Sequence, residues 1–400
     1  MNRDFERPRQ LLPTDAYTDP KWLERERRTL FDRAWVWAGI EADLARPGDF
    51  LTTSIQGQQL FVLRDDSGEL RAFHNICRHR GCEVVEGKGN VGKVVRCPYH
   101  RWTYDLSGGL RAVSNEADCF GAVGREGLSL HPASVGAHLG MVYVNPHPSP
   151  PEPFAEWVTG LAEHAWPHDF GDGSLKFAGE ITYEISCNWK VFYENAVDGY
   201  HLGYLHDGTL GPLYPDRNVW HPAGRHALWY STERDGPPQS SSILTERMVD
   251  GAGARRLQGH SPATYPGVVA LFPLTFLTPN PWGISASVLE PIDAETTRMR
   301  TLNWAPASPK GWIAKVLARA GTRKSSFAKK PPVYRLADAD RHPLESGDFQ
   351  IEDMWICEKI QRNLRSPHFQ VGPLANGPGA ESPVAHFQQS VLDYVGDGDG

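Results

Sequence analysis

Two cysteine–histidine pairs in residues 77–100 are the strongest chemical signal in the sequence. Cys77 and His79 are separated by one residue, and seventeen residues further on the second pair, Cys97 and His100, is separated by two. Thiolate and neutral imidazole are both good metal ligands, so this set predicts a metal centre. One tetrahedral zinc ion would satisfy it. A two-iron cluster would satisfy it too, with the imidazoles bound to one of the irons.

A second constellation lies in residues 188–206, NWKVFYENAVDGYHLGYLH. Its members are Glu194, Asp198, His201 and His206. The segment has helical character, but two histidines five residues apart are out of register on a straight helix. We therefore expect the helix to end or kink near Gly203. The HExxH motif is absent, which argues against a zinc protease.

Acids further along the chain are additional candidates for metal ligands. Residues 348–364, DFQIEDMWICEKIQRNL, have the pattern of an amphipathic helix and offer three acids. These are Glu352, Asp353 and Glu358. Spacing alone does not choose among them.

The two motifs together resemble the Rieske non-haem iron oxygenases, specifically the alpha (large) subunit of ring-hydroxylating systems. The spacing Cys-x-His-x17-Cys-x2-His, within FHNICRHRGC and RCPYHRWTYDLSGGL, is similar to the Rieske domain of that family. The resemblance implies a [2Fe–2S] cluster, with zinc as the alternative. Its ligands would be Cys77, His79, Cys97 and His100, while Cys82 matches no ligand position.

The resemblance also implies roles for the second constellation. His201 and His206 would bind a mononuclear Fe(II), and Asp353 is favoured as the third ligand. Asp198 would bridge His201 to a cluster histidine of a neighbouring subunit, because in this family electrons pass between subunits. A homotrimer (α₃) or an α₃β₃ assembly is therefore expected.

An α+β fold is implied, with an all-β Rieske [2Fe–2S] domain and a helix-grip catalytic domain in which an antiparallel sheet wraps a helix. Residues 19–38 look helical, with Asp19 as N-cap and Pro20 at the first position. Residues 40–145 alternate in short runs between turns, as in a compact β domain. We expect an N-terminal helical segment at 1–39 that packs on the catalytic domain, the Rieske domain at 40–148, and the iron-containing catalytic domain at 149–400.

Composition excludes several classes of protein. The chain has 400 residues, with 41 Lys and Arg against 48 Asp and Glu, and a net charge of −7. A nucleic-acid partner is not expected, because phosphate binding needs concentrated positive charge. The first residues, MNRDFERPRQ, lack an apolar signal segment, and prolines interrupt the most apolar stretch, residues 266–284. We expect no membrane span and a cytoplasmic location.

Electrons must come from another protein, because no flavin or nicotinamide fold is visible in the sequence. We expect a ferredoxin and/or a flavin reductase, NAD(P)H acting only through it, and O₂ as co-substrate. Basic residues gather around the cluster motif of an otherwise acidic chain, which predicts a docking surface for an acidic partner; a solvated surface is the alternative. They are Arg71, Arg78, Arg80, Lys88, Lys93, Arg96 and Arg101.

Side chains near the iron residues and on the facing strands are candidates for the substrate pocket, with ordinary core as the alternative. They are Phe192, Asn195, Leu202, Leu205, Phe272, Phe276 and Trp282. An apolar pocket with few polar anchors favours an aromatic substrate, hydroxylated once or cis-dihydroxylated, in aromatic hydrocarbon catabolism.

Two other functions remain open. Trp220, Trp229 and Tyr230 offer π faces of the kind that bind quaternary ammonium groups. They favour the same chemistry on a quaternary or methylated amine, by hydroxylation or N-demethylation. A Rieske electron carrier without a working iron site is the third possibility, and the combination of two histidines with a downstream acid argues against it.

Overall fold

The computed structural model describes residues 10–121, 124–162, 170–171, 173–209, 217–232, 238–239, 267–280, 283–306, 333–377 and 380–396. The chain divides into two compact units. We call them the sheet unit, Arg27–Val158 with Asp169–Gly173, and the helix–sheet unit, Met1–Glu26 with Thr159–His168 and Ser174–Gly400. Among the described helices, none has both the length and the apolar character that crossing a membrane requires.

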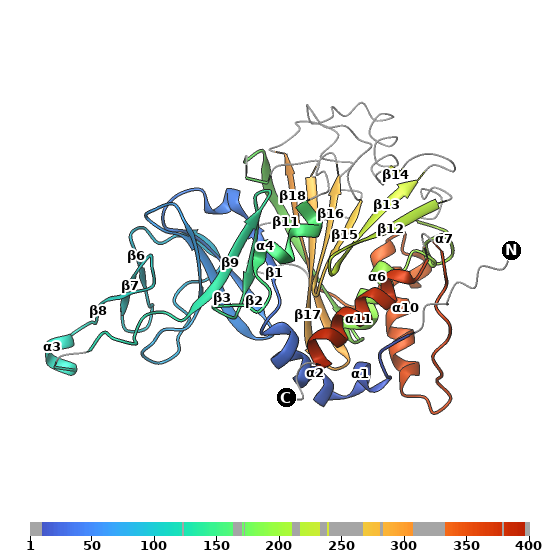
Figure 1. The fold of residues 1–400 in the computed structure, drawn as a ribbon, viewed down its shortest axis with the longest axis horizontal. Coiled ribbons are helices and arrows are strands. Elements are labelled where there is room, and N and C mark those ends of the chain that lie inside the picture. Colours follow the sequence, from blue (N-terminus) through green and yellow to red (C-terminus); the bar gives the residue numbers. More distant parts are fainter. Residues whose placement is uncertain are drawn as a thin grey trace. The chain divides into compact units, whose positions relative to one another are not determined.

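An antiparallel seven-stranded sheet forms the body of the sheet unit (Figure 1). Its spatial order is β1 (Val36–Ile40), β10 (Met141–Asn145), β9 (Pro132–His138), β4 (Leu70–His74), β3 (Gln58–Arg64), β2 (Asp49–Ile55) and β5 (Lys88–Asn90). A three-stranded sheet contains β6 (Val94–Arg96), β7 (Thr103–Asp105) and β8 (Leu110–Ala112). The short helical segments are η1 (Arg27–Phe31), η2 (Glu41–Leu44), α3 (Glu116–Cys119) and α4 (Phe154–Trp157). The two sheets share one apolar core, in which Phe61, Val95 and Tyr104 are fully buried.

The predicted helix over residues 19–38 is only partly correct. Helix α2 (Pro20–Glu26) begins where predicted, and Asp19 Oδ1 accepts a hydrogen bond from the Lys21 N–H at 2.8 Å. The helical stretch then gives way to β1, which pairs with β10 far along the chain. This long-range pairing overrides the local periodicity. Residues 27–39 lie in the sheet unit, which extends to Val158, whereas we expected them to belong to the N-terminal segment.

In the described part of the helix–sheet unit, a nine-stranded sheet is accompanied by several helices, of which α6, α10 and α11 are the longest (Figure 1). The spatial order is β12 (Arg217–Ala223), β13 (His226–Thr232), β15 (Val268–Leu271), β16 (Thr275–Asn280), β17 (Gly283–Asp293), β18 (Thr296–Pro306), β11 (Leu175–Ile185) and β19 (Val333–Tyr334), with β14 (Pro238–Gln239) beside β13. Helix α6 (Trp189–Val197) contacts α10 (Phe349–Leu364), α11 (Ser382–Gly396) and β17. The shorter elements are α1 (Asp15–Thr18), α5 (Thr159–Ala162), α7 (Leu202–Leu205), η4 (Leu336–Asp338) and η5 (Pro343–Glu345). The expected α+β class is confirmed.

The predicted helix over residues 188–206 breaks earlier than expected. Helix α6 ends at Val197, and Asp198 has an extended backbone, with φ −83° and ψ 110°. His201 then precedes the single turn α7, so the break lies before the first histidine and not near Gly203.

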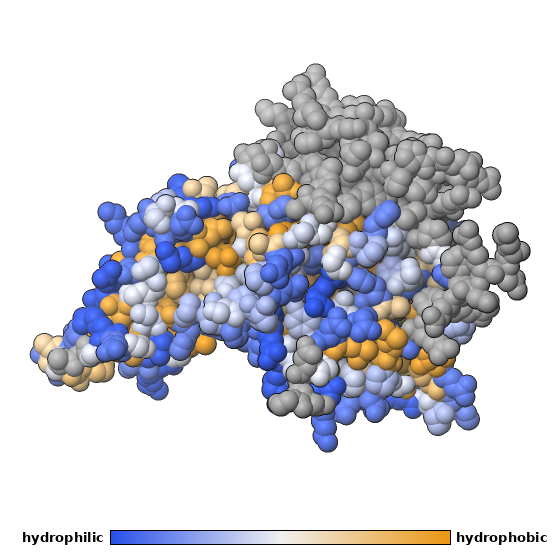
Figure 2. All heavy atoms as spheres, in the orientation of Figure 1, coloured by the Kyte–Doolittle hydropathy of each residue, from blue (hydrophilic) through white to orange (hydrophobic). Residues whose placement is uncertain are grey.

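On the face shown in Figure 2, hydrophilic side chains cover much of the coloured surface, and apolar residues appear in patches between them.

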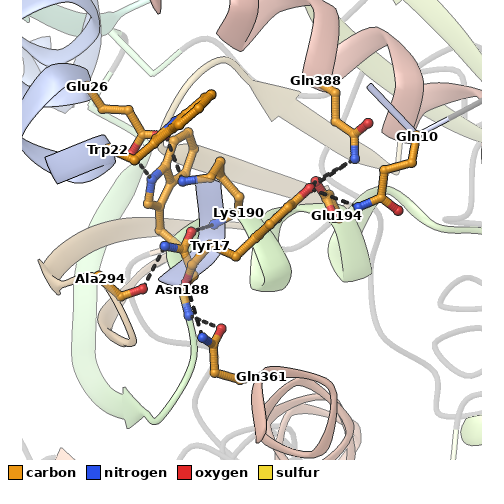
Figure 3. Close-up of polar contacts among 11 residues, drawn as sticks. Gln10, Tyr17, Trp22, Glu26, Asn188, Lys190, Glu194, Ala294, Gln361 and Gln388 are labelled. Atoms are coloured by element: carbon orange, nitrogen blue, oxygen red, sulfur yellow. Dashed lines mark hydrogen bonds and ion pairs between the residues drawn. The ribbon is translucent and has the colours of Figure 1, made fainter. Parts of the chain in front are cut away.

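Asn188 and Lys190 fix the start of α6 (Figure 3). Asn188 caps the helix, since its Oδ1 accepts a hydrogen bond from the Lys190 N–H at 3.0 Å. Its Nδ2 donates to the carbonyl of Ala294 at 2.7 Å, and its backbone N–H donates to Oε1 of Gln361 at 2.9 Å. The side chain of Asn188 therefore caps the first turn of α6 and ties it to the turn after β17, and its backbone N–H ties it to α10.

A buried ion pair ties α6 to α2 (Figure 3). Lys190 Nζ lies 2.7 Å from Glu26 Oε1, and both side chains have no solvent exposure. The same carboxylate accepts hydrogen bonds from the indole N–H groups of Trp22 at 3.1 Å and Trp189 at 2.9 Å. Burial lowers the pKa of Lys190, and the Glu26 carboxylate opposes that shift. The pair is thus fully partnered, as a buried charge must be.

Removing one member of this pair should strongly destabilise the protein. In Lys190→Met, Glu26 keeps its buried charge but loses its cation, which costs ~3–5 kcal/mol of unfolding free energy. In Lys190→Met combined with Glu26→Gln, neither charge is present and an acceptor for the indoles remains. We expect urea unfolding, followed by tryptophan fluorescence, to show the double variant more stable than the single one. A double variant less stable than the single one would contradict the prediction, because it would mean that the Glu26 carboxylate does not destabilise the fold when its cation is missing.

Helices α1 and α11 meet α6 at the carboxylate of Glu194 (Figure 3). The Tyr17 hydroxyl and the Gln388 amide both donate to Oε1 of Glu194, at 2.6 and 2.9 Å. Burial raises the pKa of Glu194 to about 7, although these two hydrogen bonds and the charge of Lys190 lower it. The site therefore favours the protonated carboxyl.

Stability should depend on pH through Glu194. Its contribution is present below the ordinary pKa of 4.5 and is lost as pH rises through about 7, because the folded state holds the proton more tightly. Glu194→Gln keeps an acceptor oxygen without the charge. We expect its thermal-unfolding midpoint to rise relative to wild type between about pH 5 and about pH 8. The exposed Asp340→Asn is the control, and an unchanged pH dependence in Glu194→Gln would contradict the prediction.

Candidate metal centres

Two loops of the sheet unit share one backbone pattern and contain the cysteine–histidine pairs. The Gly81 N–H donates to the carbonyl of Cys77 at 2.9 Å, and the Arg101 N–H donates to the carbonyl of Cys97 at 3.0 Å. Each cysteine N–H donates to the carbonyl five residues further on, at 2.8 and 2.9 Å. Gly81 and Arg101 are both left-handed, with φ of 74° and 61°. The two loops therefore form the same turn. The sequence does not make this obvious, because the spacing between cysteine and histidine differs in the two pairs.

The two turns bring the ligand side chains together. Nδ1 of His79 lies 3.1 Å from Nδ1 of His100, and Cys77 and Cys97 are both buried. Two atoms that bind one metal at ~2.1 Å and at a right angle are ~3.0 Å apart, so the two nitrogens fit one metal ion. In the part of the chain that the structure describes, these four side chains do not form a group around a single ion. The geometry favours a two-metal cluster over one zinc.

Tyr104 is a functional neighbour that the sequence analysis missed. Its hydroxyl lies 3.4 Å from Cys77 Sγ and accepts a hydrogen bond from the Arg78 N–H at 3.0 Å. Burial raises the pKa of the Cys77 thiol, and the Tyr104 hydroxyl lowers it. Burial also lowers the pKa of His79, as does the charge of His100, so the imidazole is neutral and has a lone pair for a metal.

Aromatic side chains surround the two imidazoles at the surface. His79 stacks on Trp102 with ring centroids 5.0 Å apart, and Tyr99 lies 3.7 Å from His100. Phe120 meets His79 edge-on and is 44% exposed, at the end of α3 where Figure 2 shows apolar residues. The imidazole edge of the centre is therefore packed against rings but lies close to solvent, which suits an electron-transfer centre.

Several of the basic residues that were predicted to attract an electron-transfer protein form ion pairs or ring contacts within the sheet unit. Arg71 pairs with Asp65 at 2.6 Å, and Lys88 lies 3.4 Å from Asp43. The Arg80 guanidinium lies over the Tyr99 ring, beside the imidazole edge.

His201, His206 and Asp353 bring three ligand atoms to one point in the helix–sheet unit. The Nε2 atoms of His201 and His206 are 3.2 Å apart. Asp353 Oδ1 lies 3.5 Å from Nε2 of His201 and 3.1 Å from Nε2 of His206. Within the described residues, this is the one group of three such side chains that could hold a metal ion. The three separations fit ligands on one face of a metal, which leaves the opposite face open.

The structure shows which of the three acids faces the metal-binding nitrogens, a choice that their spacing in the sequence leaves open. Asp353 faces the Nε2 atoms, whereas Glu352 Oε2 lies 2.6 Å from the opposite ring nitrogen of His206, Nδ1. Glu358 accepts a hydrogen bond from the Ser186 N–H at 3.0 Å. Asp353 alone belongs to the triad.

Asp198 and Asn195 hold the other two ligands. Asp198 Oδ2 lies 3.2 Å from Nδ1 of His201, and Asn195 Nδ2 donates to Asp353 Oδ1 at 2.9 Å. Burial lowers the pKa of His201, but hydrogen bonds to Asp198 and Asp353 outweigh it and raise the pKa to about 9. The carboxylates thus favour positive charge at this position, and a metal ion replaces the proton with a larger charge.

The pocket candidates fall into three groups. Phe192, Phe272 and Phe276 are buried core residues, and Phe276 packs on Tyr193 with centroids 4.7 Å apart. Asn195 contacts the triad, as described above. Leu202 and Leu205 lie on α7 and are partly exposed. Trp282 lies outside the described residues.

Two family profiles match the chain. The profile "Rieske [2Fe-2S] domain" matches residues 34–122. The profile "Ring hydroxylating alpha subunit (catalytic domain)" matches residues 173–397, which is more than half of the chain. The chain belongs to the Rieske oxygenase alpha subunits. Its cofactors are accordingly a Rieske [2Fe–2S] cluster and a mononuclear iron that works with O₂, and both constellations offer suitable donor sets.

Relatives of this Rieske oxygenase subunit include enzymes named for quaternary amines. The glycine betaine monooxygenase oxygenase subunit of Chromohalobacter salexigens is 33% identical over 96% of this chain and 84% of its own. The carnitine monooxygenase oxygenase subunit of Acinetobacter baumannii is 30% identical over 54% of this chain, which spans 57% of that subunit. The structure of the quaternary ammonium Rieske monooxygenase CntA with L-carnitine shares the fold, with a TM-score of 0.72, 24% identity, and coverage of 96% and 94%.

Metal content should separate the two centres. The oxygenase, purified without O₂, should contain about three irons and two acid-labile sulfides per chain. Asp353→Ala should lose only the mononuclear iron, because the cluster ligands belong to the other unit, and should keep the reduced-cluster EPR spectrum. Glu358→Gln, on the same helix, is the control and should keep all three irons. A sulfide-free protein that contains zinc would contradict both assignments.

Proposed function

We propose that this chain is the terminal oxygenase component of a system that hydroxylates a quaternary or methylated amine at a carbon bound to nitrogen. The observation that carries the proposal is the 33% identity to a glycine betaine monooxygenase oxygenase subunit over nearly the whole chain. The relative named as a carnitine monooxygenase oxygenase subunit points to the same substrate class. Aromatic hydrocarbon catabolism, the main expectation from the sequence, finds no support among these relatives.

The reaction is a balanced monooxygenation. One oxygen atom of O₂ enters a C–H bond next to nitrogen, and the other leaves as water after taking up two electrons and two protons. When an N-methyl group is hydroxylated, the product releases formaldehyde and the demethylated amine. Iron(II) held by His201, His206 and Asp353 supplies the activation of O₂. The side chains of this chain hold the metal and orient its ligands.

Charge at the iron site supports a cationic substrate. Three carboxylates, of Asp198, Glu352 and Asp353, lie around two imidazoles. A dication against three ionised carboxylates leaves one net negative charge, which favours the ammonium end of such a substrate near the metal. Trp220 and Trp229 pair across β12 and β13 but are only 9% and 1% exposed, so they are core residues and do not offer open π faces to a cation.

The proposed route of the electrons runs through Asp198. Its carboxylate is partly exposed; Oδ2 contacts His201, and Oδ1 accepts a hydrogen bond from the Tyr200 N–H at 2.6 Å. A carboxylate oxygen can accept more than one hydrogen bond, so the proposal adds one from a cluster histidine of a neighbouring subunit. The proposal therefore includes a homotrimer (α₃), or an α₃β₃ assembly, and a reductase or ferredoxin that transfers electrons from NAD(P)H. The intact triad argues against a pure electron carrier.

Product analysis tests the substrate class. Chemically reduced protein is given ¹⁸O₂ and one of two sets of compounds: glycine betaine, L-carnitine and choline, or naphthalene and benzoate. We expect labelled hydroxylated product or formaldehyde only from the amines, because the acidic site attracts the ammonium group. Asp353→Ala supplies the blank. Turnover of the aromatic compounds without turnover of any amine would overturn the proposal.

A further inference from the structure

A fully buried carboxylate lies behind one of the two iron-site histidines. Glu352 and His206 are each 1% exposed, and Oε2 of Glu352 lies 2.6 Å from Nδ1 of His206. The same oxygen accepts a hydrogen bond from the Thr209 hydroxyl at 2.7 Å. Thr209 is placed there by a turn in which its N–H donates to the carbonyl of His206 at 2.9 Å. Histidine and threonine from one turn thus converge on one carboxylate oxygen of α10.

This arrangement fixes which nitrogen of His206 has the proton. An ionised carboxylate only accepts hydrogen bonds, so the Nδ1 that faces it must be the donor. A neutral imidazole protonated on Nδ1 has its lone pair on Nε2. That lone pair faces the other two ligand atoms, at 3.2 Å from Nε2 of His201 and 3.1 Å from Asp353 Oδ1. The carboxylate also makes the imidazole a more basic ligand.

The two histidines of the triad are held in different ways. His201 has the carboxylate of Asp198 at 3.2 Å, and both side chains are 17% exposed. The contact between His206 and Glu352 is 0.6 Å shorter and is closed to solvent, so water does not weaken it. The ring of Phe349, one turn earlier on α10, packs edge-on against His206 at 6.2 Å. One turn of α10 therefore supplies three of the side chains that contact His206, from Phe349, Glu352 and Asp353.

We propose that Glu352 is a positioning residue of the iron site, which holds His206 in the orientation and tautomer that bind the metal, with Thr209 holding Glu352. The inference rests on the proposed function, in which His206 and Asp353 bind iron. It separates two neighbouring acids: Asp353 binds the metal, and Glu352 sets the affinity of a ligand for it.

The test is the affinity of the mononuclear site for Fe(II), measured on protein that keeps its cluster. The mononuclear site is emptied with a chelator, and Fe(II) is titrated back without O₂ in competition with that chelator. Glu352→Leu removes the acceptor at similar volume, and we expect it to weaken Fe(II) binding by ~10- to 100-fold. Glu352→Gln keeps an acceptor oxygen and should lose less than ~10-fold. Thr209→Val, which removes only the second hydrogen bond, should lose less than Glu352→Leu.

The visible spectrum of the cluster and the thermal midpoint report folding in the same samples. A lower midpoint with wild-type affinity for Fe(II) in Glu352→Leu would mean that Glu352 is merely structural, and would overturn the inference. If Glu352→Leu fails to fold, Glu352→Gln and Thr209→Val decide: wild-type affinity in both overturns it. Asp353→Ala distinguishes a failure of the proposed iron site from a failure of the positioning role alone. Unchanged Fe(II) binding in that variant refutes the proposed iron site itself, whereas its loss together with unaffected Glu352 variants refutes only the positioning role.

Discussion

The iron site depends on the contact between α6 and α10, because its ligands come from two segments about 150 residues apart in the sequence. Three polar interactions hold the two helices together: the Asn188 N–H to Gln361, the Asn195 amide to Asp353, and Glu352 to His206, at 2.9, 2.9 and 2.6 Å. Each one joins a residue at or beyond α6 to a side chain of α10. Ligand atoms must lie ~3 Å apart to share one metal, so a small slide of one helix along the other would remove the site.

The N-terminal segment contributes to this precision without touching the ligands. Glu26 and Tyr17 bind Lys190 and Glu194, so α6 is anchored on the side of α1 and α2 as well as on the side of α10. Burying a lysine and two acids is costly, and each is tolerated only with well-placed partners. Polar anchors of this kind require one geometry, whereas an apolar interface would tolerate sliding. The NWK sequence before the histidine motif is thereby explained as the attachment of α6.

The sequence indicated the site residues that lie close together in one segment, and it missed those that depend on contacts between distant segments. The Cys77 and Cys97 pairs and the histidines of the iron site stand close together in the chain, so their spacing was visible. Asp353 was favoured only through the resemblance, because spacing treats it and Glu352 alike; which ring nitrogen each acid meets depends on helix packing. Tyr104, Glu26 and Tyr17 left no local mark, since their partners lie 27, 164 and 177 residues away. For the same reason β1 was mistaken for the end of a helix.

The contrast between the two histidines suits the two tasks that the site must combine. A metal that stays bound through many turnovers needs at least one ligand whose orientation never changes, and His206, sealed against Glu352, meets that need. In the proposed function an electron enters from another subunit, and the partly exposed Asp198 with His201 is the proposed path from the surface. If both Asp198 and Glu352 were buried, both imidazoles would be held rigidly but the site would have no carboxylate near the surface. If both were exposed, water would compete for both imidazoles and weaken the hold on the metal. On these proposals, α10 retains the iron and the break after α6 gives access to it.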